Sequence, residues 1–398
     1  MPDRDTCEGA MNPPHAADWD PYSPEARDNQ IAVYDEMRRR CPVAYSEALG
    51  WSLFKHADVM RALETPEVFS NAVSSHLSVP NGMDPPQHTA YRRIIEPYFS
   101  VDRIEALEPR CRTIAREVLA ALPTTGEVDV MAHFAPDFAL QAQCAFLGWP
   151  VELHRPLRDW VKKNHAATRS RDREAMALVA FEFDQHIRRV LEERRAAGLD
   201  AEDVASQLLR EQLGDRQLTD EEIVSILRNW TVGELATISA CIGILIGFLA
   251  QHGTIQTRLR SDPTLLPAAI DEILRIESPL ASSRRVTKCP VRTGTREIGG
   301  GERITLMWAS ANRDATVFDD PETFRLDRDP ALNLLYGAGI HVCPGAPLAR
   351  LELRVLMEES LAAFEVMPSA GKQPTRASYP ASGFHSCPVR LRKMPAVL

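Results

Sequence analysis

Helical spacing dominates the pattern of apolar and polar residues along this chain of 398 residues. Apolar positions recur at intervals of three and four, between capping residues and Pro or Gly breaks. The first helix, for example, starts at Ser23-Pro24-Glu25 and ends before Cys41-Pro42. The pattern predicts helices over residues 24–40, 55–64, 87–99, 101–122, 136–147, 151–168, 172–197, 202–212, 219–252, 254–260, 265–277 and 346–363.

A smaller part of the sequence predicts strands. Residues 43–45 and 51–54 form two short runs around a turn at Gly50, and residues 388–391 form a last strand. Residues 284–308 alternate Val, Ile and Thr runs with glycines, which is typical of a small sheet with turns. The expected fold class is therefore mostly α with a minor β part.

Length alone favours two or three domains, at about 150 residues each. No Pro/Ser/Gly-rich linker divides the sequence, so we expect a single domain over residues 21–398. Residues 1–20 are polar and hold three prolines, which predicts a flexible N-terminal segment without a signal peptide. The apolar run Leu235–Ala250 is shorter than the roughly 20 residues of a membrane span, so it indicates a buried core helix.

Charge and cysteine content narrow the function classes. The formal charge is −9, which disfavours non-specific binding to nucleic acid or to an anionic membrane, and we expect neither as a partner. The eight cysteines contain no CxxC pattern, and a chain of this length needs no disulfide framework. A reducing cytoplasm is the expected location.

One loop combines unusual chemistry in a short stretch, Leu335–Gly345. Two glycines precede Cys343, which Pro344 and Gly345 separate from a predicted helix. A helix N-terminus favours the thiolate of a preceding cysteine, and glycines let the backbone approach a bulky group. The loop therefore presents either one thiolate to a metal or an inert cysteine in a tight turn.

These residues resemble the heme-binding loop of the cytochrome P450 superfamily. The core Gly339-x-His341-x-Cys343-x-Gly345 is intact, although Leu335-Tyr336 stand where Phe-Gly is usual. The resemblance implies a mostly α triangular prism, with heme b between the helix at 219–252 and the loop of Cys343, its axial iron ligand.

Other segments support the resemblance in the expected order. Glu272 and Arg275 match the ExxR motif, whose members share a helix face and, in the family, brace the loop under the heme. Residues 321–325 resemble the later motif, but Thr323 replaces its arginine, so Arg325 or Arg328 is expected to substitute.

The resemblance also implies a set of heme-propionate ligands. His88 and Arg92 are four residues apart on one predicted helix face, and cationic donors there suit a carboxylate. Arg285 matches the strand arginine of the family, with Arg284 as the competing assignment. His341 completes this set.

The central helix departs from the family's acid–alcohol pattern. The family's pattern is Ala/Gly-Gly-x-Asp/Glu-Thr. In this sequence Gly233 is in place, but Leu235 stands at the acid position and Ala236 at the alcohol position. We therefore expect Glu234 and Thr237 to act as a rearranged catalytic pair beside Gly233. The rival interpretation is that Thr237 bonds the carbonyl one turn back and that Glu234 is solvated or binds substrate.

The implied function is insertion of one oxygen atom from O2 into a small or medium organic substrate, by hydroxylation or oxidative dealkylation. Electrons would come from a separate ferredoxin or flavodoxin-type donor with its reductase, and Arg350 and Arg354 could meet an acidic partner. The alternatives are a peroxide-driven peroxygenase, other heme-thiolate chemistry, or a heme sensor or carrier without turnover. Expected pocket residues are His76, Leu77, Val79, Asn81, Met83, Thr231, Ala281 and Ser282.

Overall fold

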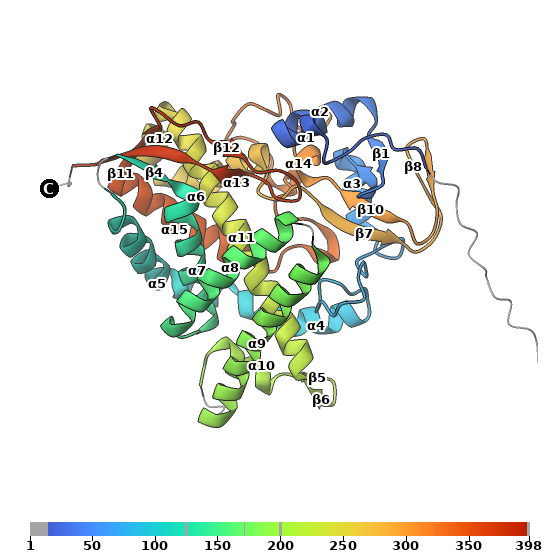
Figure 1. Ribbon diagram of the computed structural model, residues 1–398, viewed down its shortest axis with the longest axis horizontal. Helices are drawn as coiled ribbons and strands as arrows, with labels where there is room; N and C mark the ends of the chain where they lie inside the picture. Colours follow the sequence, from blue (N-terminus) through green and yellow to red (C-terminus); the bar gives the residue numbers. More distant parts are fainter. Residues whose placement is uncertain (1–14, 124–125, 171, 199–200, 396–398) are drawn as a thin grey trace, which may run out of the picture.

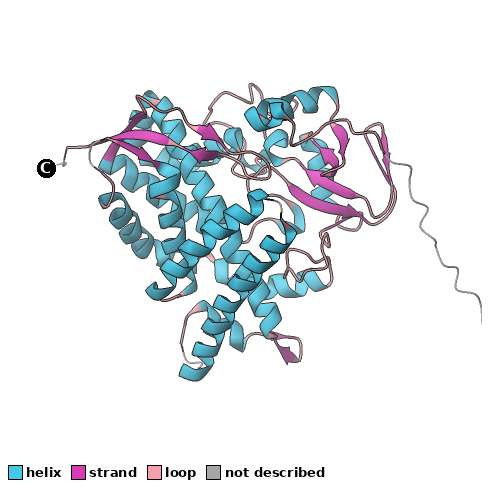
Figure 2. Cartoon of the chain, in the orientation of Figure 1, coloured by secondary structure: helices cyan, strands magenta, loops and turns pink. Residues whose placement is uncertain are grey.

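Helices form most of the structure, and the strands gather in small sheets (Figure 2). This computed structural model describes residues 15–123, 126–170, 172–198 and 201–395. The prediction of a mostly α fold with a minor β part is confirmed. The helices are α1 Pro24–Asp28, α2 Gln30–Arg40, α3 His56–Glu64, α4 Gln87–Ile95, α5 Val101–Ala120, α6 Val130–His133, α7 Ala135–Leu147, α8 His154–Ser170, α9 Arg173–Ala197, α10 Val204–Arg210, α11 Asp220–Gln251, α12 Gly253–Ser261, α13 Leu266–Glu277, α14 Trp308–Ala311 and α15 Ala346–Ala363.

Two predicted helices are each divided in the structure. The helix expected at 24–40 breaks at Asn29, whose side chain accepts a hydrogen bond from the Ala32 N–H and so starts α2. The helix expected at 87–99 ends as α at Ile95 and continues as a 3₁₀ turn, Glu96–Phe99. Pro97 lacks the N–H that an α-helix would use there.

The main sheet has five strands in the order β1 Val43–Ser46, β2 Gly50–Leu53, β10 Arg303–Leu306, β7 Ser283–Thr287 and β3 Phe69–Ser70. Gly50 has φ of 69°, and a Cβ there would lie 2.4 Å from the Arg303 carbonyl oxygen. Glycine at this turn is therefore what allows β1 and β2 to join β10.

The remaining strands form smaller sheets, several of which the sequence pattern did not predict. One has the order β11 Phe364–Pro368, β14 Pro388–Lys393 and β4 Glu127–Asp129. Three two-stranded sheets pair β12 Thr375–Arg376 with β13 Phe384–Ser386, β5 Gln212–Leu213 with β6 Arg216–Gln217, and β8 Val291–Thr293 with β9 Arg296–Ile298.

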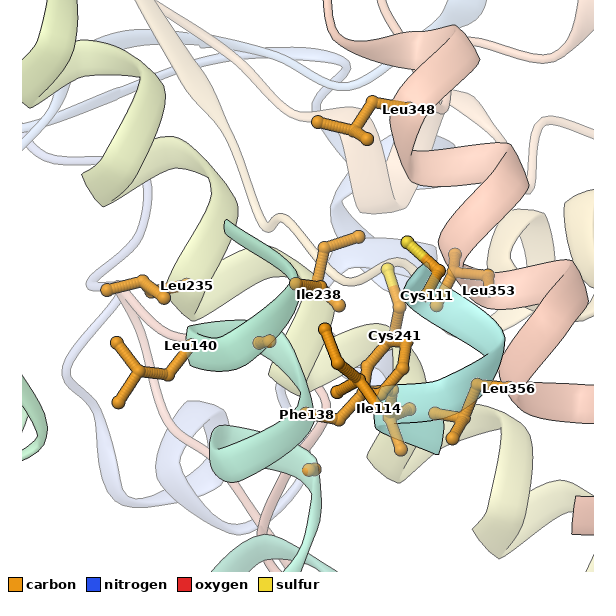
Figure 3. Packing of buried hydrophobic residues seen from close by; sticks show 14 of the residues in the cluster. Cys111, Ile114, Phe138, Leu140, Leu235, Ile238, Cys241, Leu348, Leu353 and Leu356 are labelled. Atoms are coloured by element: carbon orange, nitrogen blue, oxygen red, sulfur yellow. The ribbon is translucent and has the colours of Figure 1, made fainter. Parts of the chain in front are cut away.

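Helix α11 runs through the middle of the molecule (Figure 1). A capping box between Thr219 and Glu222 begins it. Its apolar side chains pack against α5, α7 and α15 (Figure 3). By length and composition α11 could span a membrane, but 61% of its most apolar window is buried within the protein. This burial agrees with the predicted core helix.

Residues 15–20 contact the main sheet. Trp19 is buried against Phe54, and Asp18 forms an ion pair of 2.7 Å with Arg296. The rest of the predicted flexible segment, residues 1–14, lies outside the described residues. The division at residue 20, with one domain beyond it, stays a prediction.

Candidate functional site

The loop before α15 is tightly folded around Cys343. The Cys343 N–H donates to the Tyr336 carbonyl at 2.9 Å, and residues Gly339–His341 form a 3₁₀ turn. Gly339 has φ of 67°, and a Cβ on it would lie 2.3 Å from the Leu63 carbonyl oxygen of α3. Only glycine fits there, so α3 fixes the position of the loop.

The Cys343 residue remains accessible to solvent, although protein surrounds its sulfur on most sides. Burial raises the pKa of this thiol, while the backbone N–H groups of Gly345 and Ala346 act in the opposite direction. The described residues contain no group of three or more His, Cys, Asp or Glu side chains that could hold a metal ion. A metal bound by Cys343 would therefore take its other ligands from a cofactor.

The ExxR pair forms a buried ionic network with a third member, as expected. Arg275 donates from Nε and Nη2 to the Glu272 carboxylate at 2.7 and 2.9 Å. Arg328 donates from Nε to the same carboxylate at 2.9 Å, whereas the Arg325 side chain pairs with Asp327 at the surface. Of the two arginines left open by the sequence, Arg328 is the one whose side chain joins Glu272, whereas Arg325 donates to it only through its backbone N–H at 3.2 Å.

This network is connected to the cysteine loop through two asparagines. Arg275 Nη1 donates to the Asn312 carbonyl at 2.6 Å, and the Asn312 side chain accepts from the Leu334 N–H at 2.8 Å. Asn333 accepts from the Leu335 N–H at 2.9 Å. The ionic network thus holds the start of the loop through its backbone.

Four nitrogen-bearing side chains converge on the other side of the loop. The rings of His88 and His341 lie 4.2 Å apart between centroids, and Arg92 donates to the Val342 carbonyl at 2.9 Å. Arg285 is 4% exposed, whereas its neighbour Arg284 points to solvent. The structure therefore places Arg285, not Arg284, inside the protein.

Arg92 forms an ion pair of 3.1 Å with Glu96, but the histidines of this cluster have no such partner among the described residues. Both His88 ring nitrogens and His341 Nε2 are buried without a hydrogen-bond partner among the described residues. Burial lowers the pKa of Arg285 to about 10, and burial followed by His88 and Arg285 lowers that of His341 to about 3. Buried donors without acceptors are costly, so the cluster suits carboxylates such as the two propionates of heme. The residues present fit this cofactor.

Gly233 and Ala236 are both exposed positions of the central helix. The hydroxyls of Thr231 and Ser239 donate to the carbonyl one turn back. Thr237 makes no such bond to any described residue, so its hydroxyl is free for another partner. The carboxyl group of Glu234 approaches Glu352 of α15 rather than Thr237.

The loop over the expected substrate side is fixed to α11 by polar side chains. Ser225 Oγ accepts from the Val79 N–H at 2.8 Å, and Asn229 donates to the Val79 carbonyl at 2.9 Å. Arg228 donates to the Leu77 carbonyl at 2.9 Å and to Asp184 of α9 at 2.8 Å. His76 and Leu77 are exposed, whereas Val79 belongs to the core.

Other expected pocket residues divide in the same way. Asn81 is exposed, and Met83 and Ser282 are partly buried. Ala281 and Thr231 are buried, and Ala281 packs in an apolar cluster with Trp19 and Phe54.

Sequence reasoning missed the residues that hold this loop and the partner of Glu234. Glu352 stands one turn from both Leu348 and Leu356, and all three are buried. A lone carboxyl in the apolar stripe of a predicted helix was the available signal. Nothing in the local sequence around Arg228 indicated a contact with residue 77.

Comparisons with known proteins point to one family. The model of the family described as Cytochrome P450 matches residues 161–390. The chain is 30% identical over 341 residues to cyclomarin C epoxidase of Salinispora arenicola, covering 81% of this chain and 86% of the relative. It is 32% identical over 345 residues to vitamin D(3) 25-hydroxylase of Pseudonocardia autotrophica, covering 82% and 84%.

Solved structures show the same fold. The crystal structure of CYP109E1 from Bacillus megaterium in complex with testosterone matches with a TM-score of 0.81 and 29% identity, covering 91% of this chain and 99% of that one. The open cytochrome P450 EryK from S. erythraea matches with a TM-score of 0.84 and 27% identity, covering 92% and 96%.

The chain therefore belongs to the cytochrome P450 family. It is a heme-thiolate monooxygenase that uses heme b. This confirms the predicted fold, cofactor and enzyme class. Epoxidases and hydroxylases among the relatives favour a monooxygenase over a peroxygenase or a carrier.

The ionic network gives a direct test of which arginine supports the loop. Arg328→Ala leaves the buried Glu272 carboxylate with one partner fewer, so the heme content of the purified protein should fall and the protein should lose about 3–5 kcal/mol of stability. Arg325→Ala is the matched control and should keep both, because its ion pair is exposed. Heme-to-protein absorbance and thermal unfolding measure the two effects. Equal losses in the two variants would contradict the assignment.

Proposed function

We propose that Cys343 supplies the axial iron ligand and that His88, Arg92, Arg285 and His341 hold the heme propionates. The observation that carries this proposal is the set of buried donors without an acceptor beside an accessible cysteine. Bound there, heme supplies oxygen activation, for which a thiolate ligand favours cleavage of the O–O bond.

The protein itself positions the cofactor, excludes water and moves protons. Glu272 and Arg275, joined by Arg328, hold the loop in its shape from below. A Cβ added to Gly233 would have nothing within 4 Å of it. Gly233 therefore leaves room on the face of α11 above the loop. The free hydroxyl of Thr237 lies on that helix to pass a proton, with Glu234 as the nearby acid.

For the substrate we propose a medium-sized lipophilic compound. CYP109E1 was crystallised with testosterone, and other relatives are named as hydroxylases of vitamin D(3) and erythromycin. The exposed side chains of the loop at 71–77 are mixed, with Val73 and Leu77 beside serines and His76. This mixture suits an apolar body with few polar groups.

For the electron donor we propose a separate ferredoxin or flavodoxin-type protein with its reductase, in the cytoplasm. Of the two arginines expected to meet it, Arg350 is about half exposed, pairs with Asp271 and lies over the Tyr336 ring. Arg354 is less exposed and pairs with Glu108 and Glu358. Arg350 is therefore the better placed of the two for an acidic partner.

The thiolate assignment has a spectroscopic test. The reduced carbon monoxide complex should show the red-shifted Soret band of thiolate ligation, and Cys343→Ala should lose it. Cys289→Ala, which removes another exposed cysteine, should retain the band. A red-shifted band in Cys343→Ala would overturn the assignment.

The propionate assignment distinguishes two neighbouring residues. Arg285→Ala should weaken heme retention by about 1.5–3 kcal/mol, the value of a charge-assisted hydrogen bond. Arg284→Ala should have little effect because Arg284 is exposed. Heme transfer to apomyoglobin measures the loss, and equal transfer rates would count against Arg285.

The reaction class is tested by turnover. Testosterone, vitamin D(3) and erythromycin are each incubated with the holoenzyme and NADH, a ferredoxin and its reductase, and separately with hydrogen peroxide alone. We expect an oxygenated product of at least one compound in the NADH reaction at a higher rate than with peroxide. Product with peroxide only would instead indicate a peroxygenase.

A further inference from the structure

Two carboxyl side chains meet where α11 packs against α15. Glu234 comes from the middle of α11, and Glu352 comes from the second turn of α15. Glu352 has no exposed surface at all. Their carboxyl groups lie within hydrogen-bonding range of each other. This contact belongs to neither the ExxR network nor the propionate cluster.

Nothing among the described residues compensates these two carboxyl groups. Apart from this mutual contact, Glu234 Oε1 and both oxygens of Glu352 are buried and receive no hydrogen bond from any described donor. The other titratable groups that face them are thiols: Cys111 of α5, Cys241 of α11 and Cys343 of the loop. Figure 3 shows the first two among apolar side chains of α5, α7, α11 and α15.

A carboxylate can only accept hydrogen bonds, so two ionised carboxylates cannot bond each other. Burying both charges without a cation would cost several kcal/mol for each ion. Two carboxyl groups that share a buried site keep one proton between them. Glu352 is the more deeply buried member and is the natural holder of that proton.

We propose that Glu234 and Glu352 share one proton as a carboxyl pair and that this pair is the internal acid that supplies protons to Thr237. The role of the pair as proton donor rests on the proposed function, whereas the shared proton does not. The pair replaces the acid that the central helix lacks, because Leu235 stands at the usual acid position.

The electrostatics of the site agree with this assignment. Burial raises the pKa of Glu352 well above its usual range, and the neighbouring Glu234 raises it further. Burial also raises the pKa of Glu234, while a hydrogen bond from Glu352 opposes that effect. These directions are the ones expected when a protonated Glu352 donates a hydrogen bond to Glu234.

The proton transfer needs no reactant other than water. Glu234 and Thr237 are three residues apart on α11, so their side chains share a face. The O–H bond of the pair breaks and a proton passes, directly or through water, to the Thr237 oxygen, which releases its own proton to the site. A proton from solvent reaches the pair as the first proton leaves, so the two carboxyl groups are not ionised together.

The shared proton has a direct test on the resting holoenzyme. Infrared difference spectra of wild type against Glu352→Gln should contain the carbonyl stretch of a protonated carboxylic acid at about pH 7, where an ordinary Glu is ionised. Glu234→Gln should shift or remove the same band. The matched control Glu359→Gln, from the C-terminal part of α15 where Glu359 pairs with Arg112 and Arg116, should not change it. Absence of the band from wild type overturns the pair.

Stability gives an independent reading of the same proton. Because folding raises the pKa of Glu352, its contribution is full below about pH 4.3 and is lost as the pH rises toward the folded pKa. Wild type should therefore lose at least about 2 °C in Tm relative to Glu352→Gln between about pH 5 and 8.

The control should show the opposite trend. Burial tends to raise the pKa of Glu359, but hydrogen bonds from Arg116 and Arg112 lower it overall. Glu359→Gln should thus lose stability relative to wild type as the pH rises. A flat difference for Glu352→Gln would overturn the shared proton.

The role of the pair is measured with the compound that turns over in the NADH reaction. Glu352→Gln and Glu234→Gln should each lower product formation by about 10², the lower end for an acid–base group, and release peroxide instead. Unchanged product in both variants, with the infrared band present in wild type, would overturn the proton-donor role. Failure of the proposed function is distinct, because it would appear as loss of the thiolate spectrum in wild type.

Discussion

The Glu272 carboxylate is the interaction on which the cysteine loop depends. This carboxylate accepts hydrogen bonds from two buried guanidinium groups, those of Arg275 and Arg328. Arg275 also donates to the Asn312 carbonyl, and the Asn312 side chain accepts from the Leu334 N–H. A buried ion pair gives little net stability on its own, but losing one member is costly because the others stay charged. The network therefore acts less as a source of stability than as a geometric constraint on where the loop begins.

The second constraint on the loop comes from close backbone approach. Gly339 leaves no space for a Cβ beside Leu63, so α3 and the loop fit together in one register. Between these two fixed ends the backbone presents Cys343, and the donors of His88, His341 and Arg285 surround the same region. Ionic network, glycine contact and donor cluster come from segments far apart in the sequence, which explains why the site needs the whole fold.

Much of this arrangement could be predicted from sequence, because helical periodicity and short motifs are local properties. The long helix at 219–252, the ExxR pair and the Cys343 loop were all expected, and the choice between Arg284 and Arg285 needed only the strand's burial. What the sequence could not provide were contacts between distant segments. Arg328 rather than Arg325 joins Glu272 because of the path of residues 320–328, and Glu234 turns to Glu352 because α15 lies beside α11. The breaks at Asn29 and Pro97 depend on capping and a missing N–H, which periodicity does not register.

Arg228 of α11 links two segments that lie far apart in the sequence, the helix α9 and the loop that contains Leu77. Its guanidinium binds Asp184 on α9 and the Leu77 carbonyl on the loop at the same time. Displacing either segment would leave this partly buried charge with fewer partners, which disfavours the movement of each segment. A single side chain of the central helix therefore restrains both the loop and α9.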